Sequence, residues 1–210
     1  MNPNVYFTFS EKEKLAVFLP GKTGTMHATF ILNHFDFTTS IFNRNNQILI
    51  SEDNYVIHHH DEFLPTTYQD YDVIYTARNP YSRLVSMYYH DKNMGAVNTP
   101  HTNSFKEYFS RKANHGMFHI NAGFNFVKKP KYILRMEHLY DDYIQIPFIK
   151  NSKLNQCGIL QELCNKKIHT KKQETKSLKE YYTQDMADYV YSTLKPYFDL
   201  TGYDKDSWNQ

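Results

Sequence analysis

The segment Pro20-Gly-Lys-Thr-Gly-Thr25 has residue types that bind phosphate groups. The apolar run 15–19 precedes it, and apolar residues at helical spacing follow over 26–35, so a buried strand is predicted to turn here into a helix. Such a turn presents backbone N–H groups at the positive end of the helix dipole, and Lys22 adds a full charge. We therefore expect Gly21, Lys22, Thr23, Gly24 and Thr25 to hold an anion. An ordinary tight turn with a solvated lysine is the alternative.

The same turn resembles the end of a nucleotide-binding P-loop, whose pattern is GxxxxGK[ST]. The leading glycine of that pattern would fall at Ala16, which lies inside the predicted strand. A P-loop nucleotide kinase would also need Mg²⁺ and an acidic ligand for it on a second strand. Ala16 argues against such a kinase, which is kept as an alternative function.

A second anion site is predicted around Arg78, which follows the clearest strand of the sequence, 72–77. Ligands of open α/β sheets bind at the carboxyl ends of the strands. Asn79 and Pro80 are typical of the N-cap and first position of a helix, and this helix is predicted to carry Ser86. An arginine guanidinium and a serine hydroxyl are suitable partners for a terminal phosphate. A capped helix with surface arginines is the alternative.

The remaining elements follow from hydrophobic periodicity. Strands alternate with helices, which predicts an α/β fold with a central, mostly parallel sheet, formed by residues 1–210 as a single domain. Further strands are expected at 47–50, 55–60 and 131–136, helices at 104–113, 137–144 and 183–197, and a polar, basic loop with a short helix at 151–175.

Taken together, the two anion segments resemble the sulfotransferases that use 3′-phosphoadenosine 5′-phosphosulfate (PAPS). That family has a Lys-x-Gly-Thr-like turn for the 5′-phosphosulfate, here at 22–25, and an Arg-Asn-Pro segment with a serine eight residues after the arginine. The resemblance implies that Arg78 and Ser86 hold the 3′-phosphate. Weaker similarity covers 132–139 and 197–203. The family implies a P-loop-like three-layer fold, PAPS as co-substrate and no metal.

Three consecutive histidines, His58, His59 and His60, offer a general base. Strand alternation would place His58 and His60 on one face and His59 on the other. This pattern resembles the His-x-His element of sulfotransferases similar to heparan sulfate 2-O-sulfotransferase, which implies a base at His60, next to Asp61, or at His58. Structural or surface histidines and a metal site are the alternatives.

Seven basic residues lie between 166 and 179. The position of this segment resembles that of a late loop that covers the cofactor in the sulfotransferase family. The resemblance implies that Lys171 and Lys172 contact the donor. A solvated, charged loop is the alternative.

The amino-acid composition excludes further classes of protein. The 210 residues carry a formal net charge of +2, far less basic than a dedicated nucleic-acid binder. Two cysteines form no disulfide framework, and the sequence shows neither a signal peptide nor a membrane span, so a soluble cytoplasmic protein is predicted. The expected partner is a hydroxyl acceptor, by resemblance a glycan. A non-catalytic module that binds anions or glycans is a second alternative function.

Overall fold

The structure is a computed structural model that describes residues 5–35, 37, 40–42, 48–50, 68–93, 104–114, 129–166 and 176–209, of which 5–7, 40–42 and 48–50 are described as backbone only. Their contacts group the chain into two compact units. The first unit comprises 1–77 and 122–169, and the second comprises 78–121 and 170–210. No helix of the described ranges has the length and apolar character needed to cross a membrane.

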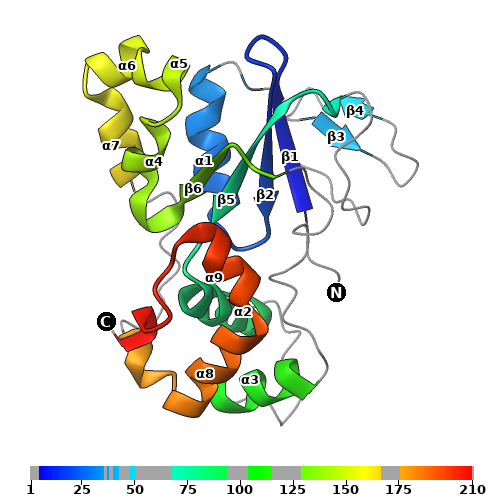
Figure 1. The fold of residues 1–210 in the computed structure, drawn as a ribbon, viewed down its shortest axis with the longest axis vertical. Coiled ribbons are helices and arrows are strands. Elements are labelled where there is room, and N and C mark those ends of the chain that lie inside the picture. Colours follow the sequence, from blue (N-terminus) through cyan, green and yellow to red (C-terminus); the bar gives the residue numbers. More distant parts are fainter. Residues whose placement is uncertain are drawn as a thin grey trace. The chain divides into compact units, whose positions relative to one another are not determined.

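The first unit contains a four-stranded sheet in the order β1-β2-β5-β6 (Figure 1). Strands β2, β5 and β6 run parallel, and β1 pairs antiparallel with β2 at one edge. This confirms a mixed α/β fold with a mostly parallel sheet, although β1 was not predicted. The strands are β1 (Val5–Ser10), β2 (Leu15–Pro20), β5 (Asp72–Ala77) and β6 (Tyr132–Arg135).

A separate antiparallel pair, β3 (Ser40–Phe42) and β4 (Ile48–Ile50), lies beside the sheet near β1. Strand β4 confirms the short strand predicted at 47–50. The strand predicted at 55–60 lies outside the described residues.

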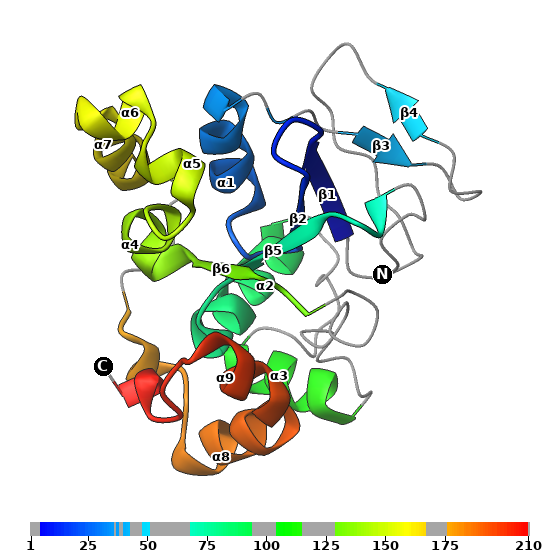
Figure 2. The ribbon, with the colours of Figure 1, turned by 45° about the horizontal axis from the view of Figure 1, so that its top comes forward.

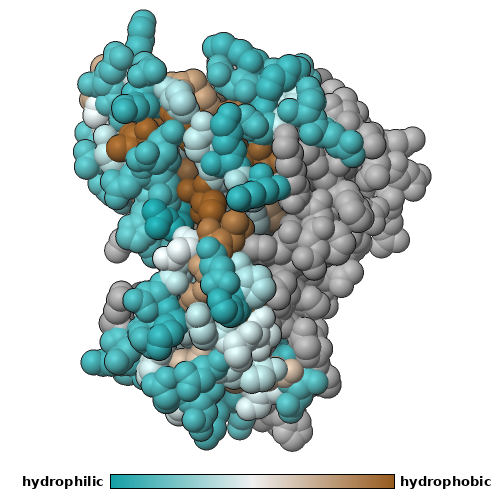
Figure 3. Space-filling view, viewed as in Figure 1, coloured by the Kyte–Doolittle hydropathy of each residue, from teal (hydrophilic) through white to brown (hydrophobic). Residues whose placement is uncertain are grey.

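Short helices cover the sheet of the first unit. Every residue of β2 is buried, as a continuous apolar run in a parallel sheet requires. Figures 1 and 2 both show the helices α4 to α7 beside α1. In Figure 3, apolar residues (brown) are visible between hydrophilic ones (teal) on this face. The helices of this unit are α1 (Thr25–Leu32), η1 (Asn33–Phe35), η4 (Met136–His138), α4 (Leu139–Tyr143), α5 (Pro147–Lys150), α6 (Lys153–Gln156) and α7 (Ile159–Asn165).

The second unit is helical and packs mainly through aromatic rings. Tyr81 contacts Tyr182 and Phe198, with ring centroids 5.2 and 5.7 Å away. The single helix predicted over 183–197 is wrong in one respect, because α8 ends at Thr193 and a second helix follows. The helices are α2 (Pro80–Asn93), α3 (Phe105–Asn114), η5 (Leu178–Glu180), α8 (Gln184–Thr193), α9 (Lys195–Thr201) and η6 (Ser207–Asn209).

Candidate functional site

The turn between β2 and α1 is closed by its own backbone. The Thr23 N–H donates to the Pro20 carbonyl at 3.3 Å. Lys22 has a φ of 66° and Gly24, the N-cap of α1, has a φ of 75°, so two residues adopt the left-handed conformation within one short turn. The Lys22 side chain is half-buried beside this bend. The predicted strand, turn and helix are all present.

The Thr23 side chain points into the fold rather than toward a ligand. The residue is fully buried, and its hydroxyl donates to the Pro20 carbonyl at 2.6 Å. The same oxygen lies 2.9 Å from the hydroxyl of Thr76, which itself donates to the Phe18 carbonyl at 3.2 Å. This hydroxyl pair ties the turn to the end of β5. The Thr25 hydroxyl is likewise directed to the Pro20 carbonyl, at 3.2 Å.

Backbone N–H groups supply the anion-binding capacity of the turn. Within the described ranges, the N–H groups of Gly24, Thr25 and Met26 donate to no acceptor. They form the start of α1, where the helix dipole favours negative charge. Met26 is 61% exposed, so this end of the helix is open to solvent. The turn can therefore hold a phosphate or sulfate through its backbone, with Lys22 as the nearby cation.

Met136, in η4, packs directly onto the turn. A Cβ built on Gly24 would overlap Sδ, Cε and Cγ of Met136. Position 24 thus favours glycine because of its left-handed backbone, and a Cβ there would also force the flexible side chain of Met136 to move.

The second predicted anion segment begins where β5 ends. The Asn79 side chain caps α2, because its Oδ1 accepts from the N–H groups of Tyr81 at 3.0 Å and Ser82 at 3.2 Å. Pro80 is the first residue of the helix, which confirms the predicted cap and first position. The Nε–H of Arg78 donates to the Ser82 hydroxyl at 3.1 Å, so the guanidinium is held against the first turn of α2.

Ser82 is a site residue that sequence reasoning missed. Ser82 and Ser86 are four residues apart and so lie on one side of α2, and Arg78 lies four residues before Ser82, just ahead of the helix. Ser86 is half-buried, and its hydroxyl has no partner among the described residues. The i+4 spacing from Arg78 was the signal that could have identified Ser82.

Four predicted site residues lie outside the described residues: His58, His60, Lys171 and Lys172. The histidine His27 of α1, a further candidate for the base, lies 2.9 Å through Nε2 from the Leu163 carbonyl. Because a carbonyl only accepts, Nε2 of His27 must carry the hydrogen in this contact. His27 is therefore held by α7 through Nε2, and when the ring is neutral its lone pair lies on Nδ1.

Neither a disulfide nor a metal cluster involves the residues that the structure describes. Cys157 is exposed and Cys164 is half-buried, and both are free. Burial raises the pKa of the Cys164 thiol to about 12, which keeps it protonated at neutral pH. No group of three histidine, cysteine or acidic side chains in the described ranges is placed to hold a metal ion.

A cavity of about 460 Å³ lies within the second unit. Its walls combine aromatic rings, hydroxyl groups and lysines, among them Tyr88, Tyr181, Lys92 and Lys106. The Lys92 ammonium lies 5.7 Å from the centre of the Tyr88 ring. This cavity is beside the second half of α2, whereas Arg78 precedes the first residue of that helix.

Comparison with known proteins finds one family. A family model described as "Sulfotransferase domain" matches residues 22–147, more than half of the chain. The match begins at Lys22 and includes Arg78 and Ser86. None of the curated proteins and none of the solved structures compared with the chain matches it.

Proposed function

The chain belongs to the sulfotransferase family, and from that premise we propose that it transfers a sulfuryl group from PAPS to an acceptor hydroxyl. The observation that carries the proposal is the turn after β2. There the N–H groups of Gly24, Thr25 and Met26 are available at a helix start, beside a lysine.

The residues of this turn fit the phosphosulfate end of the donor. Three N–H groups offer hydrogen bonds to its oxygens without requiring a metal ion. In the proposed reaction the acceptor oxygen attacks sulfur in line, and the bond from sulfur to the oxygen of the 5′-phosphate breaks. Lys22 stabilises the negative charge that grows on that oxygen. Gly21 and Thr23 act indirectly, by shaping the turn.

Arg78 and Ser86 are proposed to bind the 3′-phosphate. The guanidinium is already oriented by Ser82, and the Ser86 hydroxyl lies farther along the same side of α2. Fixing this second phosphate would set the position of the donor relative to the acceptor. Lys171 and Lys172 are proposed as further donor contacts.

A histidine is proposed as the general base that removes the proton from the acceptor hydroxyl. His60 is the first candidate and His58 the second, on the strength of the His-x-His resemblance. His27 lacks that resemblance, and with its Nε2 held by the Leu163 carbonyl it could accept a proton only at Nδ1.

A carbohydrate is the proposed acceptor. The proposal rests on the same His-x-His resemblance, and the cavity of the second unit offers suitable chemistry. Tyrosine rings pack against the C–H faces of sugars, and hydroxyl groups bind sugar hydroxyls.

The buried hydroxyl of Thr23 is evidence against the alternative function as a P-loop kinase. In a P-loop the residue after the lysine uses its hydroxyl to bind Mg²⁺. Here that hydroxyl is fully buried and bonded to Pro20 and Thr76. Ala16 also stands in place of the leading glycine, so both ends of the P-loop pattern are altered.

Calorimetry with three ligands tests the donor proposal. The chain should bind PAPS and its desulfated product without metal, and ATP with Mg²⁺ weakly. Arg78→Ala and Ser86→Ala should weaken binding of 3′-phosphorylated nucleotides, by about 1.5–3 kcal/mol per charged hydrogen bond, and leave nucleotides without that phosphate unchanged. Arg111→Ala and Ser192→Ala, in the same unit, are matched controls.

Turnover with labelled PAPS and a panel of acceptors then separates an enzyme from a binding module. Transfer of label to a glycan supports the full proposal. Tight binding of PAPS without transfer to any acceptor would favour the non-catalytic module, and preference for ATP with Mg²⁺ would favour the kinase.

A further inference from the structure

One buried hydroxyl contacts both backbone polar groups of Arg78. Tyr197 Oη accepts a hydrogen bond from the Arg78 N–H at 3.0 Å and donates one to the Arg78 carbonyl at 2.9 Å. The Tyr197 residue is fully buried. It lies in α9, 119 positions after Arg78, and both residues belong to the second unit.

The backbone of Arg78 belongs neither to the ladder between β5 and β6 nor to the helix α2. The ladder between β5 and β6 ends one residue earlier, at the Ala77–Arg135 pair. The first helical turn is closed by Asn79, whose carbonyl accepts from the Arg83 N–H and whose side chain accepts from the Ser82 N–H. Tyr197 therefore fixes a residue that lies between the strand and the helix.

The side chain of Arg78 is held by a different helix, α2. Its Nε–H donates to the Ser82 hydroxyl at 3.1 Å, and that hydroxyl donates to the Asn79 carbonyl at 3.1 Å. The backbone of Arg78 is thus held by α9 and its guanidinium by α2. An arginine held in this way loses less conformational freedom when it binds an anion.

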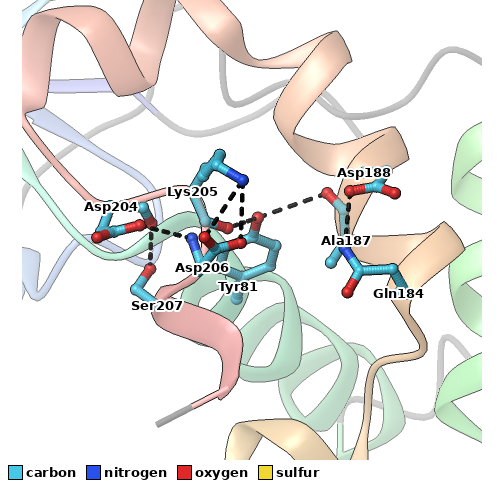
Figure 4. A network of polar contacts seen from close by, with 8 residues as sticks. All are labelled: Tyr81, Gln184, Ala187, Asp188, Asp204, Lys205, Asp206 and Ser207. Carbon is cyan, nitrogen blue, oxygen red and sulfur yellow. Dashed lines mark hydrogen bonds and ion pairs between the residues drawn. The ribbon is translucent and has the colours of Figure 1, made fainter.

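The last part of the chain reinforces the same turn. The Asn79 amide donates to the Ser207 hydroxyl at 2.7 Å. The Tyr81 hydroxyl donates to the Lys205 carbonyl at 2.6 Å, as Figure 4 shows. Burial, with Asp206 and Asp188 nearby, raises the pKa of Tyr81, so its hydroxyl remains a donor at neutral pH. These contacts hold the start of α2 but do not involve Arg78 itself.

We propose that Tyr197 and Ser82 are positioning residues for the donor nucleotide, which hold the backbone and the guanidinium of Arg78 in the geometry that receives the 3′-phosphate. This inference rests on the proposed function. Neither residue needs to touch the nucleotide, so their removal should affect only the part of the affinity that depends on Arg78.

The test compares the dissociation constants of two nucleotides, the 3′,5′-bisphosphate of adenosine and adenosine 5′-monophosphate. Tyr197→Phe keeps the ring and removes only the hydroxyl. It should raise the constant for the bisphosphate about 10-fold, because a charged hydrogen bond contributes roughly 10- to 100-fold in affinity and a misplaced arginine retains part of it. The constant for the monophosphate should not change.

Tyr182→Phe is the matched control. Tyr182 is also a buried tyrosine of the second unit, and its hydroxyl donates to the Tyr81 carbonyl at 2.9 Å. Its loss should lower the melting temperature as much as Tyr197→Phe does, while preference for the bisphosphate stays at the wild-type value. Ser82→Ala alters only a partly exposed side chain, so it provides the same test if Tyr197→Phe does not fold.

The outcomes separate the inference from the proposed function. Suppose that the wild-type protein prefers the bisphosphate and that Tyr197→Phe keeps this preference. The positioning role is then wrong and the donor proposal stands. Ser82→Ala replaces Tyr197→Phe in this comparison if the latter does not fold. An equal loss for both nucleotides would show that the hydroxyl only stabilises the fold. If the wild-type protein shows no preference, the proposed donor site itself is wrong, and the positioning role fails with it.

Discussion

Substituting Gly24 by alanine introduces a single methyl group at the most constrained point of the turn. An alanine with a φ of 75° is strained by roughly 1–2 kcal/mol. The new Cβ would also overlap three atoms of Met136, and displacing a packed side chain costs about 1–3 kcal/mol. We therefore expect Gly24→Ala to lower the free energy of unfolding by about 2–5 kcal/mol, a large share of the roughly 5–15 kcal/mol typical of a domain.

A double-mutant cycle separates the two contributions. Met136→Ala removes the overlapping atoms but leaves the backbone strain. In that background, Gly24→Ala should cost only about 1–2 kcal/mol, measured by urea unfolding followed by circular dichroism. If Gly24→Ala lowers the free energy of unfolding equally in both backgrounds, then Met136 does not restrict position 24 and η4 does not pack closely on the turn.

The remaining predictions concern catalysis and thiol chemistry. Lys22→Ala should lower kcat about 10²–10³-fold, more than it lowers PAPS affinity, because the charge of the lysine matters most as the leaving oxygen becomes charged. Near-normal turnover would remove Lys22 from the mechanism. His60→Ala or His58→Ala should reduce turnover about 10²–10⁴-fold, whereas His59→Ala should reduce it only slightly. Activity should fall at acid pH through an apparent pKa of about 6–7, because the base is then protonated. An essential His59 would contradict the predicted strand alternation. Cys164, whose pKa is raised by burial to about 12, should resist iodoacetamide at pH 8 in the native protein and react on unfolding, whereas labelling as fast as that of the exposed cysteine would contradict its burial.

Local sequence signals predicted the elements that form the anion turn and the Arg78 segment. Continuous apolar runs identified β2 and β5, and Asn79 with Pro80 identified the start of α2. Strand β1 was missed, although Val5, Phe7 and Phe9 alternate with more polar residues as an edge strand does. The long helix predicted after Thr183 failed at Pro196, because proline lacks the N–H that would continue the helical ladder.

The contacts that complete the site depend on tertiary structure. Tyr197 is the last residue of the helix predicted over 183–197, and it is fully buried. That its hydroxyl contacts Arg78 follows only from how α9 packs on α2, which periodicity does not specify. The inward direction of Thr23 is of the same kind, because it depends on Thr76 in a strand 53 positions later.

The distance along the chain between the start of α2 and its supports has a consequence for folding. Arg78, Asn79 and Tyr81 are held by residues 119, 128 and 124 positions later. Such contacts form slowly, since a long loop must close before they contribute. During synthesis, α2 leaves the ribosome well before α9 and the segment that follows it. The Arg78 segment therefore remains incomplete in a nascent chain until residues 197–207 have been synthesised.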